Sequence, residues 1–212
     1  MRHKLARLTG ATIAAILLSS VAVIGVSAHG SGHSPDLKTA RAATARFHAL
    51  GQAVAAGYGL PPAGAPLHEC ISSLTGTGAM GFHYINGGLL DTTVDPSKPE
   101  ALVYAPDRHG RLKLVALEYV VFQAPWIAEH GATMPTLFGQ MFMSTGAPNR
   151  YDIPAFFSLH VWLWKDNPAG LFAPFNPNVS CHPGAGSDGE RADDTRAEDA
   201  PAWDCRIRPR PA

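Results

Sequence analysis

The fold is decided by residues 100–122, EALVYAPDRHGRLKLVALEYVVF, whose pattern predicts a β-hairpin. Its turn is PDRHG, in which Gly110 is free to adopt a positive φ. The second strand, residues 112–122, is apolar on both alternating faces. One face carries Leu112, Leu114, Ala116, Val120 and Phe122, and the other carries Val115, Leu117, Tyr119 and Val121. Two apolar faces indicate a strand covered on both sides, which predicts a central position in the sheet.

Glu118 is the exception in that strand, because it lies between Ala116 and Val120 on an apolar face. A buried carboxylate without a partner is costly, so Glu118 needs a cation, a hydrogen-bond donor or a metal ion. The alternatives are a structural, hydrogen-bonded or ion-paired glutamate, or a strand end that is open to water.

Two histidines lie in short strands with aromatic neighbours: His83 in FHYIN, residues 82–86, and His160 in SLHVWLWKD, residues 158–166. If both strands neighbour the Glu118 strand, the three side chains form a two-histidine, one-carboxylate set. Such a set suits a divalent transition metal, with Fe, Cu and Zn as the candidates. Tyr84 and Trp162 are then expected as pocket walls. The alternative for each histidine is a satisfied core residue.

The strand that holds His160 has two unlike faces. Leu159, Val161 and Leu163 point one way, and His160, Trp162 and Trp164 point the other. The aliphatic face is the expected partner of a helix, so the His160 face lies on the side where a pocket could form.

A helix is predicted over residues 34–59, with Ser34 as the cap, Pro35 in the first turn and Gly57 and Gly59 near the end. Its expected buried stripe is Ala40, Ala43, Phe47, Leu50, Val54 and Tyr58. One helix followed by several strands predicts an α+β fold, in which the N-terminal helix packs on a mostly antiparallel sheet.

The three cysteines are Cys70, Cys181 and Cys205. In an oxidising compartment two of them would pair, and we predict Cys70–Cys181 because these two bracket the folded region. The alternatives are that Cys181 pairs with Cys205 or that no cysteines pair.

Residues 1–28 have the form of a signal peptide, with Arg2, Lys4 and Arg7 before the apolar run ATIAAILLSSVAVIGV and the small residues VSA after it. This pattern predicts a secreted or cell-envelope protein that has no membrane segment after cleavage. Residues 29–182 are the expected single domain. Residues 183–212 are rich in Gly, Pro, Ala and charge, which predicts a disordered tail.

Cleavage after Ala28 would leave His29 as the first residue, with His33 close by. The start AHG is similar to the histidine-brace start of the copper-dependent polysaccharide monooxygenases, and the similarity covers these residues alone. It implies a second possible metal site at His29 and His33. The alternative is a frayed N-terminus.

The charge balance, 17 Lys and Arg against 17 Asp and Glu, gives a formal net charge of zero. No basic patch favours nucleic acid as a partner. No Gly-x-Ser-x-Gly, His-Glu-x-x-His or Cys-x-x-Cys motif is present.

The segments MGFHYIN, residues 80–86, and HVWLWKDNPAGLF, residues 160–172, resemble those of a group of exported bacterial proteins. The resemblance covers about residues 36–181 and transfers no catalytic residue to this chain.

We therefore predict an exported protein that binds a metal ion or a small ligand through His83, Glu118 and His160. One alternative is a metal-dependent enzyme, an oxygenase or a hydrolase, on the same residues. Another is a cell-envelope interaction module whose contact surface consists of Trp162, Trp164, Phe172 and Phe175.

Overall fold

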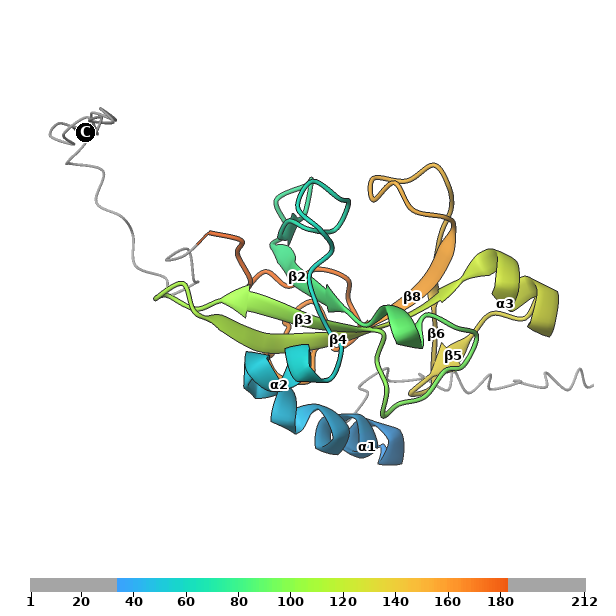
Figure 1. Ribbon diagram of the computed structural model, residues 1–212, viewed down its shortest axis with the longest axis horizontal. Coiled ribbons are helices and arrows are strands. Elements are labelled where there is room, and N and C mark those ends of the chain that lie inside the picture. Colours follow the sequence, from blue (N-terminus) through green and yellow to red (C-terminus); the bar gives the residue numbers. More distant parts are fainter. Residues whose placement is uncertain (1–33, 183–212) are drawn as a thin grey trace, which may run out of the picture. The chain divides into compact units, whose positions relative to one another are not determined.

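A six-stranded antiparallel sheet forms the centre of residues 34–182, the part of the chain that the computed structural model describes (Figure 1). Its strands in spatial order are β1 (Ile71–Ser72), β2 (Ala79–Ile85), β3 (Ala101–Pro106), β4 (Leu112–Phe122), β8 (Phe156–Val161) and β7 (Met143–Thr145). A separate pair is formed by β5 (Thr136–Leu137) and β6 (Gln140–Met141). The predicted α+β fold is confirmed.

The predicted hairpin is β3 and β4, which pair around the turn at residues 107–110. The amide of Gly110 donates to the carbonyl of Asp107 at 2.9 Å, and the φ of Gly110 is 74°. β4 has the predicted bounds and lies between β3 and β8, so its central position is also confirmed.

The alternation of β4 is interrupted by a bulge near Val115. Val103 pairs with Ala116, whereas Tyr104 pairs with Leu114, so one extra residue enters β4 between the two pairs. A bulge reverses the faces of the residues before it. Leu114 therefore joins Leu117 in the main core and Val115 joins Ala116 on the opposite face, contrary to strict alternation.

The predicted single helix over residues 34–59 is wrong in its second half. The chain forms α1 (Pro35–Thr44), a 3₁₀ turn at Ala45–His48 and α2 (Leu50–Ala55). The helix is broken at Ala49, whose backbone is extended (φ −86°, ψ 103°), and the hydroxyl of Tyr104 donates to the nearby carbonyl of Phe47 at 2.7 Å. The 3₁₀ turn changes the helical phase. As a result Ala53 is buried, and Val54, expected in the buried stripe, is 56% exposed.

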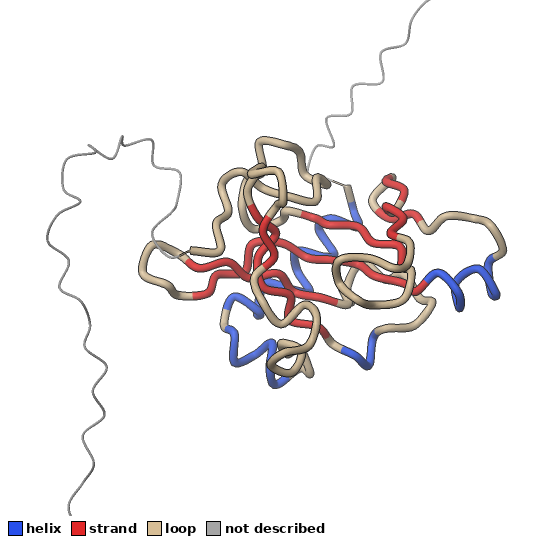
Figure 2. The backbone as a smooth tube through the Cα atoms, turned by 90° about the horizontal axis from the view of Figure 1, so that it is seen from above, coloured by secondary structure: helices blue, strands red, loops and turns tan. Residues whose placement is uncertain are grey.

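α1 and α2 cover one face of the sheet, and loops lie over the other face (Figures 1 and 2). The main core forms between the helices and the sheet, where Leu37, Ala40 and Phe47 pack with Leu117 and Val161. The aliphatic face of β8 therefore contacts the helices, as its pattern predicts. α3 (Gln123–His130) follows β4 directly and lies at one end of the sheet.

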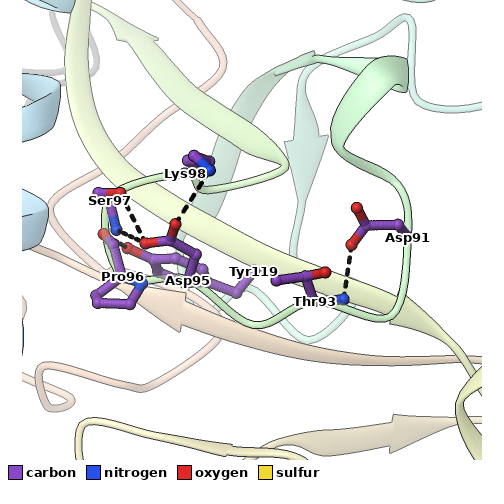
Figure 3. A network of polar contacts seen from close by, with 7 residues as sticks. All are labelled: Asp91, Thr93, Asp95, Pro96, Ser97, Lys98 and Tyr119. Carbon is purple, nitrogen blue, oxygen red and sulfur yellow. Dashed lines mark hydrogen bonds and ion pairs between the residues drawn. The ribbon is translucent and has the colours of Figure 1, made fainter. Parts of the chain in front are cut away.

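The loop between β2 and β3 is held by local hydrogen bonds (Figure 3). The amide and the hydroxyl of Ser97 both donate to Asp95, and these bonds from Ser97 lower the pKa of the Asp95 carboxyl. The hydroxyl of Tyr119 donates to the carbonyl of Pro96 at 2.8 Å, which ties the loop to β4. The loop thereby fixes the entry into β3, where Glu100 precedes the first residue.

Cys70 and Cys181 form the predicted disulfide, with a Cα–Cα distance of 5.6 Å. It joins the residue before β1 to the last part of the described chain. The predicted signal peptide, the His29 and His33 site, Cys205 and the predicted tail all lie outside the described residues. Within residues 34–182, no helix has the length and apolar character needed to cross a membrane.

Candidate metal centre

Three strands bring His83, Glu118 and His160 together on the sheet face opposite α1 and α2. Glu118 on β4 is directly paired with His160 on β8, so these side chains are cross-strand neighbours. His83 on β2 is separated from β4 by β3. On β3, His83 pairs with Val103 and Glu118 pairs with Ala101, so the His83 imidazole reaches the carboxylate on a diagonal, past the small side chain of Ala101.

The distances within the centre are short. Nε2 of His83 lies 3.2 Å from Oε2 of Glu118, and Nδ1 of His160 lies 3.3 Å from Oε1. The three side chains offer one ligand atom each within 4.8 Å of one another, a group that could hold a metal ion.

Burial makes the polar atoms of the centre costly. His83 is 2% exposed and His160 is 4% exposed, and the Glu118 side chain is 13% exposed. Nδ1 of His83 and Nε2 of His160 are buried and have no hydrogen-bond partner within the described chain, and the only polar neighbour of Nε2 of His83 there is the Glu118 carboxylate. A buried polar nitrogen without a partner costs about 1–3 kcal/mol, so these rings call for a ligand.

The pKa of Glu118 reflects two opposed effects. Burial by itself would raise the pKa of this carboxyl, but the charge and hydrogen-bonding capacity of His160, and then of His83, outweigh burial. The pKa of Glu118 is therefore held well below its usual range, and the carboxylate is ionised at neutral pH.

A cavity of about 370 Å³ opens over the centre, and His83, Glu118 and His160 form part of its wall. The rest of the wall is largely apolar, with Ile71, Met80, Ile85, Val120, Phe122 and Phe156 from four strands. Two loops close the sides, one with Ala65 and Leu67 and the other with Tyr151 and Ile153. Figure 1 shows these loops rising from the sheet face that the helices leave open.

Glu100 also lines this cavity, and the sequence interpretation did not single it out. It is 3% exposed, and its Oε2 accepts a hydrogen bond of 2.8 Å from the amide of Val120. Burial raises the pKa of Glu100 to about 8. The signal for Glu100 was its position at the very start of an apolar strand, where a carboxylate has no solvated face.

Both predicted pocket walls are wrong. Tyr84 is adjacent to His83 and therefore points to the opposite face, where its ring lies 5.0 Å from that of Tyr104. Trp162 lies beyond the end of β8, and its indole donates to the carbonyl of Ala173 at 2.6 Å. Its ring centroid is 6.0 Å from that of His160, but Trp162 packs in a smaller core cluster and does not line the cavity.

The predicted aromatic contact surface is wrong as well. Trp162 is 3% exposed. Trp164 lies on the helix side, where the Arg41 guanidinium is 4.6 Å from its ring centroid and the His48 ring contacts it edge-on. The turn after Val161, closed by a hydrogen bond from the Leu163 amide, separates the two tryptophans.

Comparisons of the chain with protein-family models, with curated proteins and with solved structures found no match. Inference about function therefore starts from the centre and its cavity.

Proposed function

We propose that this protein binds one divalent transition metal ion through His83, Glu118 and His160. The supporting observation is geometric: two buried imidazoles from different strands converge on one largely buried carboxylate, and each of the three side chains offers a ligand atom within 4.8 Å of the others. A metal ion accepts a lone pair from each ring and compensates the negative charge of Glu118.

The donor set fits a metal ion in distance and chemistry. Bond lengths of about 2.0–2.2 Å place neighbouring ligand atoms roughly 3–3.5 Å apart. The two nitrogen-to-oxygen distances, 3.2 Å to Oε2 and 3.3 Å to Oε1 of Glu118, fall in this range, and the three ligand atoms as a set lie within 4.8 Å of one another. Two imidazoles and one carboxylate suit Fe(II), Zn or Cu, and three protein ligands leave coordination positions open to another molecule.

A second candidate function, a metal-dependent enzyme, is supported by the cavity. The three side chains lie in the wall of a 370 Å³ space, so an open coordination position would face a bound small molecule. Oxygenases and hydrolases both use this arrangement of a metal ion beside a shaped cavity.

We also propose that the protein is exported. The basic start and apolar run of residues 1–28 support export. The Cys70–Cys181 disulfide supports an oxidising compartment. Mass spectrometry of the mature chain tests this proposal, and a chain that retains residues 1–28 in the cytosol would contradict it.

Metal analysis of protein purified without a His tag tests the binding proposal. We expect close to one metal ion per chain in the wild type and in His109→Ala, an exposed histidine in the hairpin turn. We expect His83→Ala and His160→Ala to lose the metal, with circular dichroism to check that they fold. Equal metal content in all four proteins would contradict the proposal.

Turnover separates the two candidate functions. Dioxygen consumption by the Fe(II)-loaded protein, or cleavage of a nitrophenyl ester by the Zn-loaded protein, would indicate an enzyme if His160→Ala abolishes it. Metal binding without either reaction would favour a binding protein.

A further inference from the structure

We infer that the cavity binds a small apolar monocarboxylate, whose carboxylate coordinates the metal ion and whose hydrocarbon body lies against the apolar wall. This inference rests on the metal site proposed above. It adds the chemical class of the second ligand, for which the cavity wall and its charges give separate evidence.

The side chains of the cavity wall favour a ligand with an apolar body. Beyond the three candidate metal ligands, the cavity is lined mainly by aliphatic and aromatic side chains, such as Ile71, Val120 and Phe156. Its volume of about 370 Å³ is at the lower end of the range of ligand pockets. Apolar surface placed there is removed from water, which favours a hydrocarbon over a sugar or a peptide.

The charges in the cavity favour a ligand that carries a single negative charge. A divalent ion and one carboxylate ligand, Glu118, leave one net positive charge in a space with a largely apolar wall. A monoanion neutralises that charge, whereas an uncharged ligand leaves it uncompensated.

No lysine or arginine is among the described residues that line the cavity. A phosphate or another dianion would therefore have no second cation to pair with. Asp152 also lines the cavity, beside Glu100 and Glu118. It is exposed, so water screens its negative charge.

Glu100 supplies a further polar contact. Its carboxyl lies in the cavity wall and accepts hydrogen bonds from the backbone amides of Val120 and of Glu100 itself. With its pKa raised to about 8 by burial, the group is protonated at neutral pH. A protonated carboxyl donates a hydrogen bond to a carboxylate oxygen, so it supports the same ligand class.

Isothermal titration calorimetry of octanoate into the full chain tests the inference, after a zinc titration has loaded the metal site. We expect zinc-loaded protein to bind octanoate about tenfold or more tightly than metal-free protein does. Octanol keeps the hydrocarbon but lacks the charge, and acetate keeps the charge but lacks the hydrocarbon. We expect each of them to bind about tenfold or more weakly than octanoate.

A matched pair of loop variants locates the octanoate. Ala65 lines the cavity, whereas Ala63 on the same loop is exposed and does not. We expect Ala65→Trp to weaken octanoate binding about tenfold or more and Ala63→Trp to leave it unchanged.

The outcomes separate this inference from the metal site. Zinc binding with octanoate no tighter than octanol, or equal octanoate affinity in Ala65→Trp and wild type, would overturn the ligand class alone. Failure of the wild type to bind zinc would overturn both the metal site and the ligand class.

Discussion

Ala101 is the residue that allows His83 to reach Glu118 across the intervening strand. It is buried on the same sheet face as the candidate metal ligands and lies opposite Glu118 in the register. A larger side chain there would fill the space through which the imidazole of His83 reaches the carboxylate.

We therefore expect Ala101→Leu to separate the ligands. Overpacking should lower the free energy of unfolding by about 1–3 kcal/mol, and the zinc affinity should fall by about tenfold or more. Ala105→Leu is the control, because Ala105 is buried on the same strand and face but lies away from the centre. If the two variants show equal zinc affinity, Ala101 has no special role in the centre.

Glu100 predicts a pH dependence of stability. Its pKa is raised from 4.5 to about 8, so the folded state holds this proton more tightly than the unfolded state does. Its contribution to stability is therefore full below pH 4.5 and is lost as the pH rises through 8.

We expect Glu100→Gln to remove this loss, because glutamine stays neutral and still accepts the Val120 amide. Urea unfolding of metal-free protein at pH 5 and pH 8 measures the effect. Relative to the variant, the wild type should lose on the order of 3 kcal/mol between these values. Parallel pH profiles for the two proteins would contradict the raised pKa.

Single residues of the centre were predictable because a polar side chain in an apolar strand needs a partner. This reasoning identified His83, Glu118 and His160. The walls were predicted less well. The position of Tyr84 was predictable, because the two-residue period of a strand places it on the face opposite His83. Trp162 could not be judged, because its orientation depends on where β8 ends.

At the scale of elements, the sequence predicted the turn of the β3–β4 hairpin, the bounds of β4 and the central position of β4 in the sheet. It did not predict the bulge near Val115 or the break after α1. Both depend on contacts between distant segments. The Tyr104 hydroxyl on the sheet, for example, donates to the carbonyl of Phe47 in the turn where the helix breaks, and such tertiary contacts compete with local helix propensity.

The loop between β2 and β3 gives a prediction at this scale. Tyr119→Phe removes the hydrogen bond to Pro96 that ties the loop to β4 (Figure 3). We expect a loss of about 1 kcal/mol in the free energy of unfolding, measured with urea. Hydrogen exchange should also become faster in residues 91–99. Unchanged exchange there would mean that the loop is held without Tyr119.

At the scale of the whole molecule, strand order brings the three side chains to one place. Sequence patterns identify strands but do not give their order in the sheet. The predicted cluster of His83, Glu118 and His160 therefore depended on the condition that β2, β4 and β8 lie close together. The cavity was not predictable for the same reason. Its wall is assembled from the six strands of the sheet and from loops that are distant in sequence.

The disulfide is the covalent constraint at this scale, with 111 residues of separation between Cys70 and Cys181. We expect the double variant Cys70→Ser, Cys181→Ser to lose about 2–5 kcal/mol in the free energy of unfolding. It should still bind zinc when folded, since neither cysteine belongs to the centre. Unchanged stability would show that the disulfide does not constrain the unfolded chain.

The most direct test of the metal site is anomalous diffraction from crystals of the zinc-loaded protein. We predict a single strong anomalous peak about 2.0–2.2 Å from a nitrogen of His83, a nitrogen of His160 and an oxygen of Glu118. No peak at these side chains, with the two imidazoles hydrogen-bonded to Glu118 instead, would show that the three residues form a structural ion-pair network and would contradict the proposed function.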